Sequence, residues 1–148
     1  MTRTLSQKKL LLFGAGKIGR SFIAQLFHQS GYFIVFTDAN LQLIQQLNEK
    51  GRYRVVVKSD NPRFVEITHF EAIHTSDKES VEKEIMECDL CAISAGKNAL
   101  PTVCKMIGGG LRARYRERPD FPLDIIIAEN MRDAAVFVRN EMKKYSPG

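Results

Sequence analysis

The feature that most constrains the fold of this chain is a glycine-rich segment, Gly14-Ala15-Gly16-Lys17-Ile18-Gly19, between two different apolar patterns. The residues before it, 9–13, form a nearly continuous apolar run, which is typical of a strand buried on both faces of a parallel sheet. The residues after it carry an apolar stripe at helical spacing, which Ser30-Gly31 ends. The stripe consists of Ile18, Phe22, Ile23, Leu26 and Phe27. This order predicts a strand, a tight turn and a helix.

The same alternation of strand and helix patterns continues along the chain. Further strands are predicted at 33–37, 71–74, 89–94 and 123–128. Further helices are predicted up to Gly51 and at 77–87, 98–111 and 131–144, where Gly108-Gly109-Gly110 weakens the end of the third. Strands that alternate with helices imply a mostly parallel sheet with helices on both faces.

One segment departs from that alternation. Residues 53–58 and 63–68 are two strand-like runs, and the turn cluster Ser59-Asp60-Asn61-Pro62 separates them. This pattern predicts a β-hairpin inserted into the series. The expected fold class is therefore α/β, a doubly wound, mostly parallel Rossmann sheet with an inserted β-hairpin. At 148 residues, 44% of them apolar, the chain suits one domain, residues 1–148.

Composition excludes several classes of protein. No apolar run approaches the roughly 20 residues that cross a bilayer, so no membrane association is expected. Three cysteines and no export signal favour the cytoplasm. The net charge is +5, but the 22 basic and 17 acidic residues are mostly interspersed, so no nucleic-acid partner is expected. The alternating arginines, Arg112 to Arg118, are interpreted as a solvated edge or a face for another domain.

The glycine segment fits the pattern G-x-G-x-x-G, and its position between strand and helix supplies the physical context. Gly14 allows the tight turn, Gly16 lets the backbone approach a diphosphate, and Gly19 allows close packing of helix on strand. The diphosphate would lie on free N–H groups at the helix N-terminus. The pattern therefore predicts a dinucleotide site. The alternative is a tight turn that binds nothing.

Asp38 ends the second predicted strand, 19 residues after Gly19. A carboxylate there can accept hydrogen bonds from the adenosine ribose hydroxyls, whereas it would repel the 2′-phosphate of NADP. The predicted cofactor is therefore NAD. The alternative role for Asp38 is a helix N-cap.

Two further groups lie where a dinucleotide would bind. Lys17 and Arg20 flank the third glycine and could contact the phosphates or be solvated. Ligands collect outside the carboxyl ends of the strands, which places Ala95-Gly96 and Asn130 at the nicotinamide end. Asn130 could instead be a helix N-cap. The candidate cofactor-binding residues are Gly14, Ala15, Gly16, Lys17, Ile18, Gly19, Asp38, Ala95, Gly96 and Asn130.

Cys88-Asp-Leu-Cys91 has the spacing of a metal or redox motif, but we reject that interpretation. Residues three apart at the start of a strand face opposite sides, and no second pair or histidine cluster completes a site. No metal is expected. The sequence also has no G-x-S-x-G elbow and no P-loop motif, which disfavours hydrolases and nucleoside triphosphatases.

Three segments of the chain carry a resemblance to a known family, namely Gly14-Ala-Gly-Lys-Ile-Gly-Arg20-Ser-Phe22, Phe36-Thr-Asp-Ala-Asn40 and Ile126-Ile-Ala-Glu-Asn-Met131. With these segments the chain resembles the N-terminal domain of the polyol dehydrogenases, the family of the mannitol and mannitol-phosphate dehydrogenases. The chain departs from that family at Lys17 and Ser21, where a small polar residue and a glycine are common. It also departs at Arg132-Asp-Ala-Ala135, which lacks an Arg-Gly-Thr-like continuation.

The resemblance implies NAD(H)-dependent interconversion of a polyol, or its phosphate, with a keto sugar. It implies that Asn130 is the catalytic residue of this chain, which polarises the reacting oxygen. The general-base lysine of the family stands on a helical C-terminal domain that is absent from this chain, so we expect binding without turnover. Two alternatives stay open: a stand-alone regulatory NAD(H)-sensing module and, more weakly, a DNA-binding redox repressor.

Overall fold

A five-stranded parallel sheet forms the centre of the protein, which a computed structural model describes over residues 7–146. The strand order is β5-β2-β1-β6-β7, and every pairing is parallel. The strands are β1 (Lys9–Phe13), β2 (Phe33–Asp38), β5 (Phe70–His74), β6 (Leu90–Ile93) and β7 (Ile125–Ile127). The expected doubly wound Rossmann sheet is confirmed.

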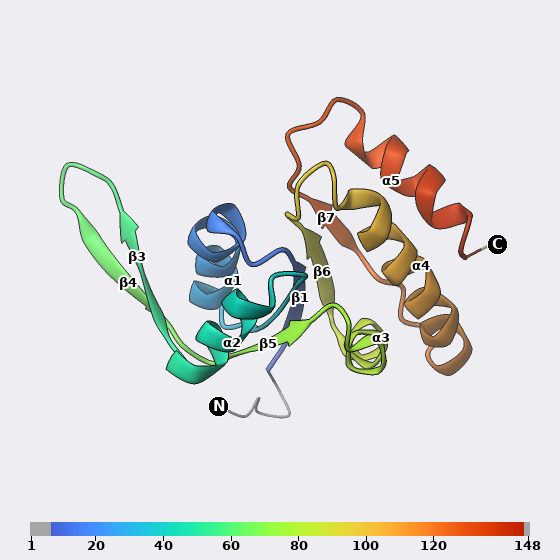
Figure 1. Cartoon of the computed structure of the whole chain (residues 1–148), viewed down its shortest axis with the longest axis horizontal. Coiled ribbons are helices and arrows are strands. Elements are labelled where there is room, and N and C mark those ends of the chain that lie inside the picture. Colours follow the sequence, from blue (N-terminus) through green and yellow to red (C-terminus); the bar gives the residue numbers. More distant parts are fainter. Residues whose placement is uncertain (1–6, 147–148) are drawn as a thin grey trace.

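Helices cover both faces of this sheet (Figure 1). They are η1 (Gly19–Ile23, a π-helical turn), α1 (Ala24–Gln29), α2 (Leu41–Lys50), α3 (Lys78–Glu87), α4 (Leu100–Glu117) and α5 (Ala134–Lys143). All of β1 is buried, as its apolar run predicted. Because side chains alternate along a strand, Leu10 and Leu12 pack with α1, α2 and the hairpin, while Leu11 and Phe13 pack with α3, α4 and α5.

The inserted hairpin consists of β3 (Tyr53–Val57) and β4 (Arg63–Ile67), which pair antiparallel in a sheet of their own. It extends away from the main sheet on the side of α1 and α2 (Figure 1). Val55 and Ile67 bury its base against the core, whereas the opposed pair Val56 and Phe64 is exposed. The predicted hairpin is confirmed.

The first helix buries only part of its apolar stripe. Ile23 is buried and Phe27 is partly buried in the core, but Ile18, Phe22 and Leu26 are exposed. The exposed three are spaced four residues apart and therefore lie along one side of the helix. The apolar pattern is thus wider than the face that the sheet covers.

Helix α4 is longer than the sequence predicts. It continues through Gly108-Gly109-Gly110 to Glu117, so the expected end near Leu111 is wrong. A Cβ atom on Gly108 would lie 2.9 Å from the Tyr145 side chain, and one on Gly110 would lie 2.6 Å from that of Ile85. These glycines let α4 pack closely on α5 and on α3. Tertiary packing therefore outweighs their weak helix propensity.

The arginine run at the end of α4 is only partly solvated. Arg114 is 3% exposed, and its Nη1 donates to the carbonyl oxygens of Ile85 at 2.9 Å and of Cys88 at 2.7 Å. Its Nε donates to Phe121 O at 3.0 Å, and Arg118 adds a bond to Met86 O. These arginines therefore satisfy free carbonyls at the C-terminus of α3, where a positive charge is also favourable. For Arg114, the expectation of a solvated edge is wrong.

The last strand and helix are shorter than predicted. The expected strand at 123–128 is the three-residue edge strand β7, where Ile126 is 38% exposed. The expected helix at 131–144 begins only at Ala134. Within residues 7–146, no helix is long and apolar enough to cross a membrane.

Candidate functional site

The candidate residues lie at one edge of the sheet, where the parallel strands end. The glycine segment follows β1, Asp38 ends β2, Ala95-Gly96 follows β6, and Asn130 follows β7. The chain runs outward from β1 through β2 to β5 and then returns to the other side of β1 with β6. Such a reversal opens a crevice at the carboxyl ends of the two flanking strands, which is the usual ligand site of open α/β sheets.

The three glycines of the segment meet three different surroundings. Gly14 has a φ of +108°, and a Cβ atom there would lie 2.2 Å from Ser94 O. A Cβ atom on Gly19 would lie 2.4 Å from Gly14 O, so the helix packs directly on the turn. A Cβ atom on Gly16 would meet nothing within 4 Å. Gly14 and Gly19 are thus required by the fold, while Gly16 leaves open space at the surface of the turn.

The turn leads directly into a helix. The N–H of Arg20 donates to Gly16 O at 3.0 Å, which marks the start of helical hydrogen bonding. The N–H groups of the preceding turn have no earlier carbonyl within the helix to bond, and the positive end of the helix dipole lies with them. This arrangement suits a phosphate group.

Asp38 is bonded to the glycine turn. Its Oδ2 accepts the N–H of Ala15 at 2.8 Å, and its Oδ1 accepts the N–H of Asn40 at 2.8 Å. The N-cap of α2 is Asn40, whose side chain accepts the N–H of Leu43, so the N-cap alternative for Asp38 is wrong. Since each carboxylate oxygen can accept two hydrogen bonds, Asp38 can still accept from a ligand hydroxyl.

A cleft opens between these loops. Residues from the ends of β1, β2, β5 and β6 and from α4 line it, among them Gly14, Asp38, Thr75, Ala95, Thr102 and Met106. The hydroxyl oxygen of Thr37, which also lines the cleft, is buried and has no hydrogen-bond partner among the described residues. The cleft therefore brings together three candidate residues from different loops, Gly14, Asp38 and Ala95. The other candidates, which are residues 16–19, Gly96 and Asn130, are not among the residues that line it.

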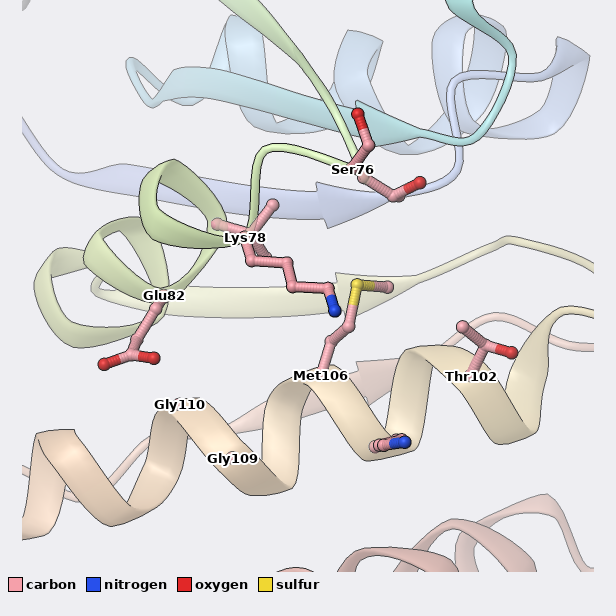
Figure 2. Close-up of a pocket in the computed structure, with 10 residues that line it drawn as sticks. Ser76, Lys78, Glu82, Thr102, Met106, Gly109 and Gly110 are labelled. Atoms are coloured by element: carbon pink, nitrogen blue, oxygen red, sulfur yellow. The ribbon is translucent and has the colours of Figure 1, made fainter.

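A larger pocket of about 420 Å³ adjoins the cleft, with which it shares Thr75, Thr102 and Met106. It lies between α3 and α4, where the side chain of Lys78 reaches toward Met106 (Figure 2). Gly109 belongs to its wall, and a Cβ atom there would meet nothing within 4 Å. The pocket extends the site from the Asp38 side toward the helices.

The other end of the site is held by a residue that sequence reasoning missed. Oε1 of Glu129 accepts the N–H of Ala95 at 2.8 Å and that of Gly96 at 3.1 Å. The neighbouring Asn130 is exposed. The N-cap of α5 is Asp133, so the N-cap alternative for Asn130 is wrong. The sequence shows that Glu129 is an acid next to the candidate residue Asn130. It does not show the partners of Glu129, because they lie 33 and 34 residues earlier in the chain.

The flanking residues of the glycine segment differ in exposure. Lys17 is exposed, as is Ile18 at 57%. Arg20 is half-buried, and its Nε is buried without a hydrogen-bond partner among the described residues. The exposure of Lys17 is compatible with a phosphate contact and with a solvated side chain. Arg20 is not a fully solvated side chain.

The cysteines lie outside this site. Cys88, Cys91 and Cys104 are free and buried. Burial raises the pKa of the Cys88 and Cys104 thiols to about 11, and raises that of Cys91 as well. Thiols with raised pKa values are poor metal ligands and poor nucleophiles near neutral pH, because the thiolate is the reactive form. Among residues 7–146, no group of three or more potential ligands could hold a metal ion.

Comparison with known proteins identifies the family. The family model "Mannitol dehydrogenase Rossmann domain" matches residues 8–147. The mannitol-1-phosphate 5-dehydrogenase of Streptococcus mutans is 34% identical over 93% of this chain, and that of Thermoanaerobacter pseudethanolicus is 36% identical over 91%. Among solved structures, the GDP-mannose dehydrogenase of Pseudomonas aeruginosa aligns over 94% of this chain and 33% of its own, with a TM-score of 0.64 at 17% identity.

The curated relatives are much longer proteins. The chain spans 36% of the Streptococcus mutans enzyme and 34% of the Thermoanaerobacter pseudethanolicus enzyme, about a third of each. The residues that match the family model include the glycine turn, Asp38 and Asn130. The chain belongs to the mannitol dehydrogenase family, of which it is the Rossmann domain.

Proposed function

We propose that this chain is the NAD-binding domain of a dehydrogenase that transfers hydride between NAD and a polyol or polyol phosphate such as mannitol 1-phosphate. The observation that carries the proposal is Asp38, whose carboxylate lies at the end of β2 and bonds to Ala15 in the glycine turn. A carboxylate in that position favours a free ribose over a 2′-phosphate, hence NAD over NADP.

The rest of the crevice supports one orientation of the cofactor. The diphosphate lies over Gly16 at the helix N-terminus, with the half-buried Arg20 one turn further along the helix. The adenosine ribose bonds to Asp38, and the adenine ring points toward the pocket between α3 and α4. The nicotinamide then lies at the opposite end, near Gly96 and Asn130.

The chemistry proposed for this chain is limited to binding and polarisation. When bound, the nicotinamide ring supplies the acceptor or donor of the hydride. The exposed amide of Asn130 donates a hydrogen bond to the reacting oxygen of the substrate. The family resemblance implies a general base in the two thirds of the relatives' length that this chain does not span, so we expect these 148 residues by themselves to bind without turnover. The cytoplasmic location stays a prediction.

Calorimetry with NADH and NADPH tests the cofactor. We expect the chain to bind NADH more tightly than NADPH. Asp38→Ala should weaken NADH binding about tenfold and should reduce the difference between the NADH and NADPH affinities. Asp60→Ala, in the exposed turn of the hairpin, is the matched control and should bind as the natural chain does. Failure of the natural chain to bind either nucleotide, or an unchanged preference in Asp38→Ala, contradicts the proposal.

The substrate needs a separate test. An open reading frame that continues past Gly148 into a lysine-bearing helical domain would supply the general base. We expect that longer protein to oxidise mannitol 1-phosphate with NAD, and Asn130→Ala to lower kcat more than it weakens NADH binding. The family membership disfavours the regulatory sensor. If the longer protein bound NADH but turned over no polyol or polyol phosphate, the result would support the alternative of a regulatory NAD(H) sensor.

A further inference from the structure

The carboxylate of Glu129 bridges two loops at the carboxyl edge of the sheet. Glu129 follows β7, and its Oε1 accepts two consecutive backbone N–H groups, those of Ala95 and Gly96 after β6. The side chain is partly buried. The side chain thus links the segment after β7 to the loop after β6.

Two backbone hydrogen bonds also hold the bridged loop. Ser94 N–H donates to Phe13 O at 2.8 Å, and Ala99 N–H donates to Gly96 O at 3.2 Å. Gly96 is exposed and has a φ of +90°. Glycine has the largest conformational freedom of any residue, so its left-handed conformation needs an external restraint to persist. The bond from Ala99 holds the carbonyl oxygen of Gly96, and the two bonds to Glu129 hold the N–H groups of Ala95 and Gly96.

The same loop is in contact with the glycine turn. The close approach of Gly14 to Ser94 O and to Ala95 Cα means that a shift of the β6 loop changes the wall of the turn. Asn130 is bonded covalently to Glu129 itself. One carboxylate thus connects the β6 loop, the glycine turn and the exposed amide of Asn130.

From this geometry we infer that Glu129 is a positioning residue for the nicotinamide end of the site. It holds the Ala95-Gly96 loop and Asn130 in one fixed arrangement, and so it controls affinity for the half of the cofactor that reaches past the glycine turn. The inference rests on the proposed function, because that function assigns the nicotinamide to this end. Its energetic origin is pre-organisation: a loop that is already ordered loses less entropy when the ligand binds.

Three variants separate the hydrogen bonds from the charge. Glu129→Gln keeps a carbonyl oxygen at the same reach, so it can still accept both N–H groups without the charge. Glu129→Asp keeps the charge but is one carbon–carbon bond shorter, so it cannot reach both. Glu129→Ala removes both properties. Glu49→Ala, at an exposed position of α2 far along the chain from this loop, is the control.

The measurements are NADH affinity, ADP affinity and amide exchange at Ala95 and Gly96. We expect Glu129→Ala and Glu129→Asp to weaken NADH binding about tenfold, and Glu129→Gln to bind within about twofold of the natural chain. ADP, which lacks the nicotinamide half, should bind equally to all variants. If Glu129 contributed only to the general stability of the fold, its variants would not lower NADH affinity while they leave ADP affinity unchanged. The two amides should exchange faster in Glu129→Ala and stay protected in Glu129→Gln.

Two results would overturn the inference. One is NADH affinity that is unchanged in Glu129→Ala, and the other is affinity that follows the charge, with Glu129→Asp normal and Glu129→Gln weak. If the natural chain bound no NADH at all, the proposed function would fail instead. Amide exchange would then still decide whether Glu129 orders the loop, since unchanged protection in Glu129→Ala refutes that role.

Discussion

Oδ2 of Asp38 accepts the backbone N–H of Ala15 at 2.8 Å, so the acid expected to recognise the ribose also fixes the glycine turn. Its neighbour Asn40 caps helix α2 instead. We therefore expect Asp38→Ala and Asn40→Ala each to lower the free energy of unfolding by about 1 kcal/mol, from a lost hydrogen bond and a lost cap respectively. Urea denaturation measures both effects.

The two variants should differ in binding. Only Asp38→Ala should narrow the difference between NADH and NADPH affinity, because Asn40 supplies a cap and no contact to the ribose in the proposed orientation. An equal change of preference in both variants would mean that the order of α2, and not the carboxylate, selects the nucleotide.

Gly14 and Gly16 allow a matched comparison within one turn. Gly14→Ala places a methyl group against Ser94 O at a positive φ, so we expect a loss of at least about 3 kcal/mol of stability. Gly16→Ala meets open space and should change stability by less than about 1 kcal/mol. It should nevertheless weaken NADH binding, because the methyl group occupies the surface proposed for the diphosphate. If a folded Gly16→Ala chain bound NADH normally, the diphosphate would not lie over Gly16 as proposed.

The glycine run of α4 gives a second pair. Gly110→Ala drives a methyl group to 2.6 Å from the stiff, branched side chain of Ile85, so overpacking should lower stability by about 1–3 kcal/mol. Gly109→Ala meets nothing within 4 Å and should raise stability by up to about 1 kcal/mol through helix propensity. We expect the urea midpoint of Gly110→Ala to lie below that of the natural chain and the midpoint of Gly109→Ala to lie above it. Equal midpoints would show that α3 and α4 separate easily.

Arg114 should be the arginine of α4 on which stability depends most. Arg114→Met keeps most of the side-chain volume but removes the donor from the Cys88 carbonyl and leaves the Ile85 carbonyl with the weak bond from the Cys88 thiol. We expect a loss of about 2–4 kcal/mol. Arg112→Met, at an exposed position of the same helix, should stay within about 0.5 kcal/mol of the natural chain. Thermal unfolding compares them, and equal losses would refute the special role of Arg114.

The buried thiols predict a dependence on alkaline pH. Burial raises the pKa of Cys88 to about 11 from an ordinary value of 9.0, so the folded state keeps a proton that the unfolded state releases. The contribution of this thiol to the free energy of unfolding is therefore fully present below about pH 9 and is lost as the pH rises toward 11. Burial raises the pKa of Tyr53 in the same direction. Urea midpoints should fall through this range.

A thiol reagent gives an independent check on the same cysteines. At about pH 8 the folded chain should react slowly, and all three cysteines should react once urea unfolds it. Fast reaction of the folded chain, or urea midpoints that do not change with pH, would contradict the burial of these side chains.

Much of the fold could be predicted because its signals are local. The apolar run of residues 9–13, the glycine turn after it and the turn cluster from Ser59 to Pro62 each depend on neighbours a few positions away. The spacing from Gly19 to Asp38 is likewise set by one strand–helix unit. The sequence by itself therefore determined the Rossmann sheet, the inserted hairpin and the edge at which the candidate residues gather.

Tertiary structure decided the features whose partners are distant in sequence. Helix α4 continues through three glycines because Tyr145 and Ile85 pack against two of them, Gly108 and Gly110. Arg114 is buried because the carbonyls at the end of α3 need a donor. Glu129 orders a loop more than thirty residues before it. Propensity and spacing cannot report such contacts, because the free energy of each comes from a neighbour that only the folded chain brings within reach.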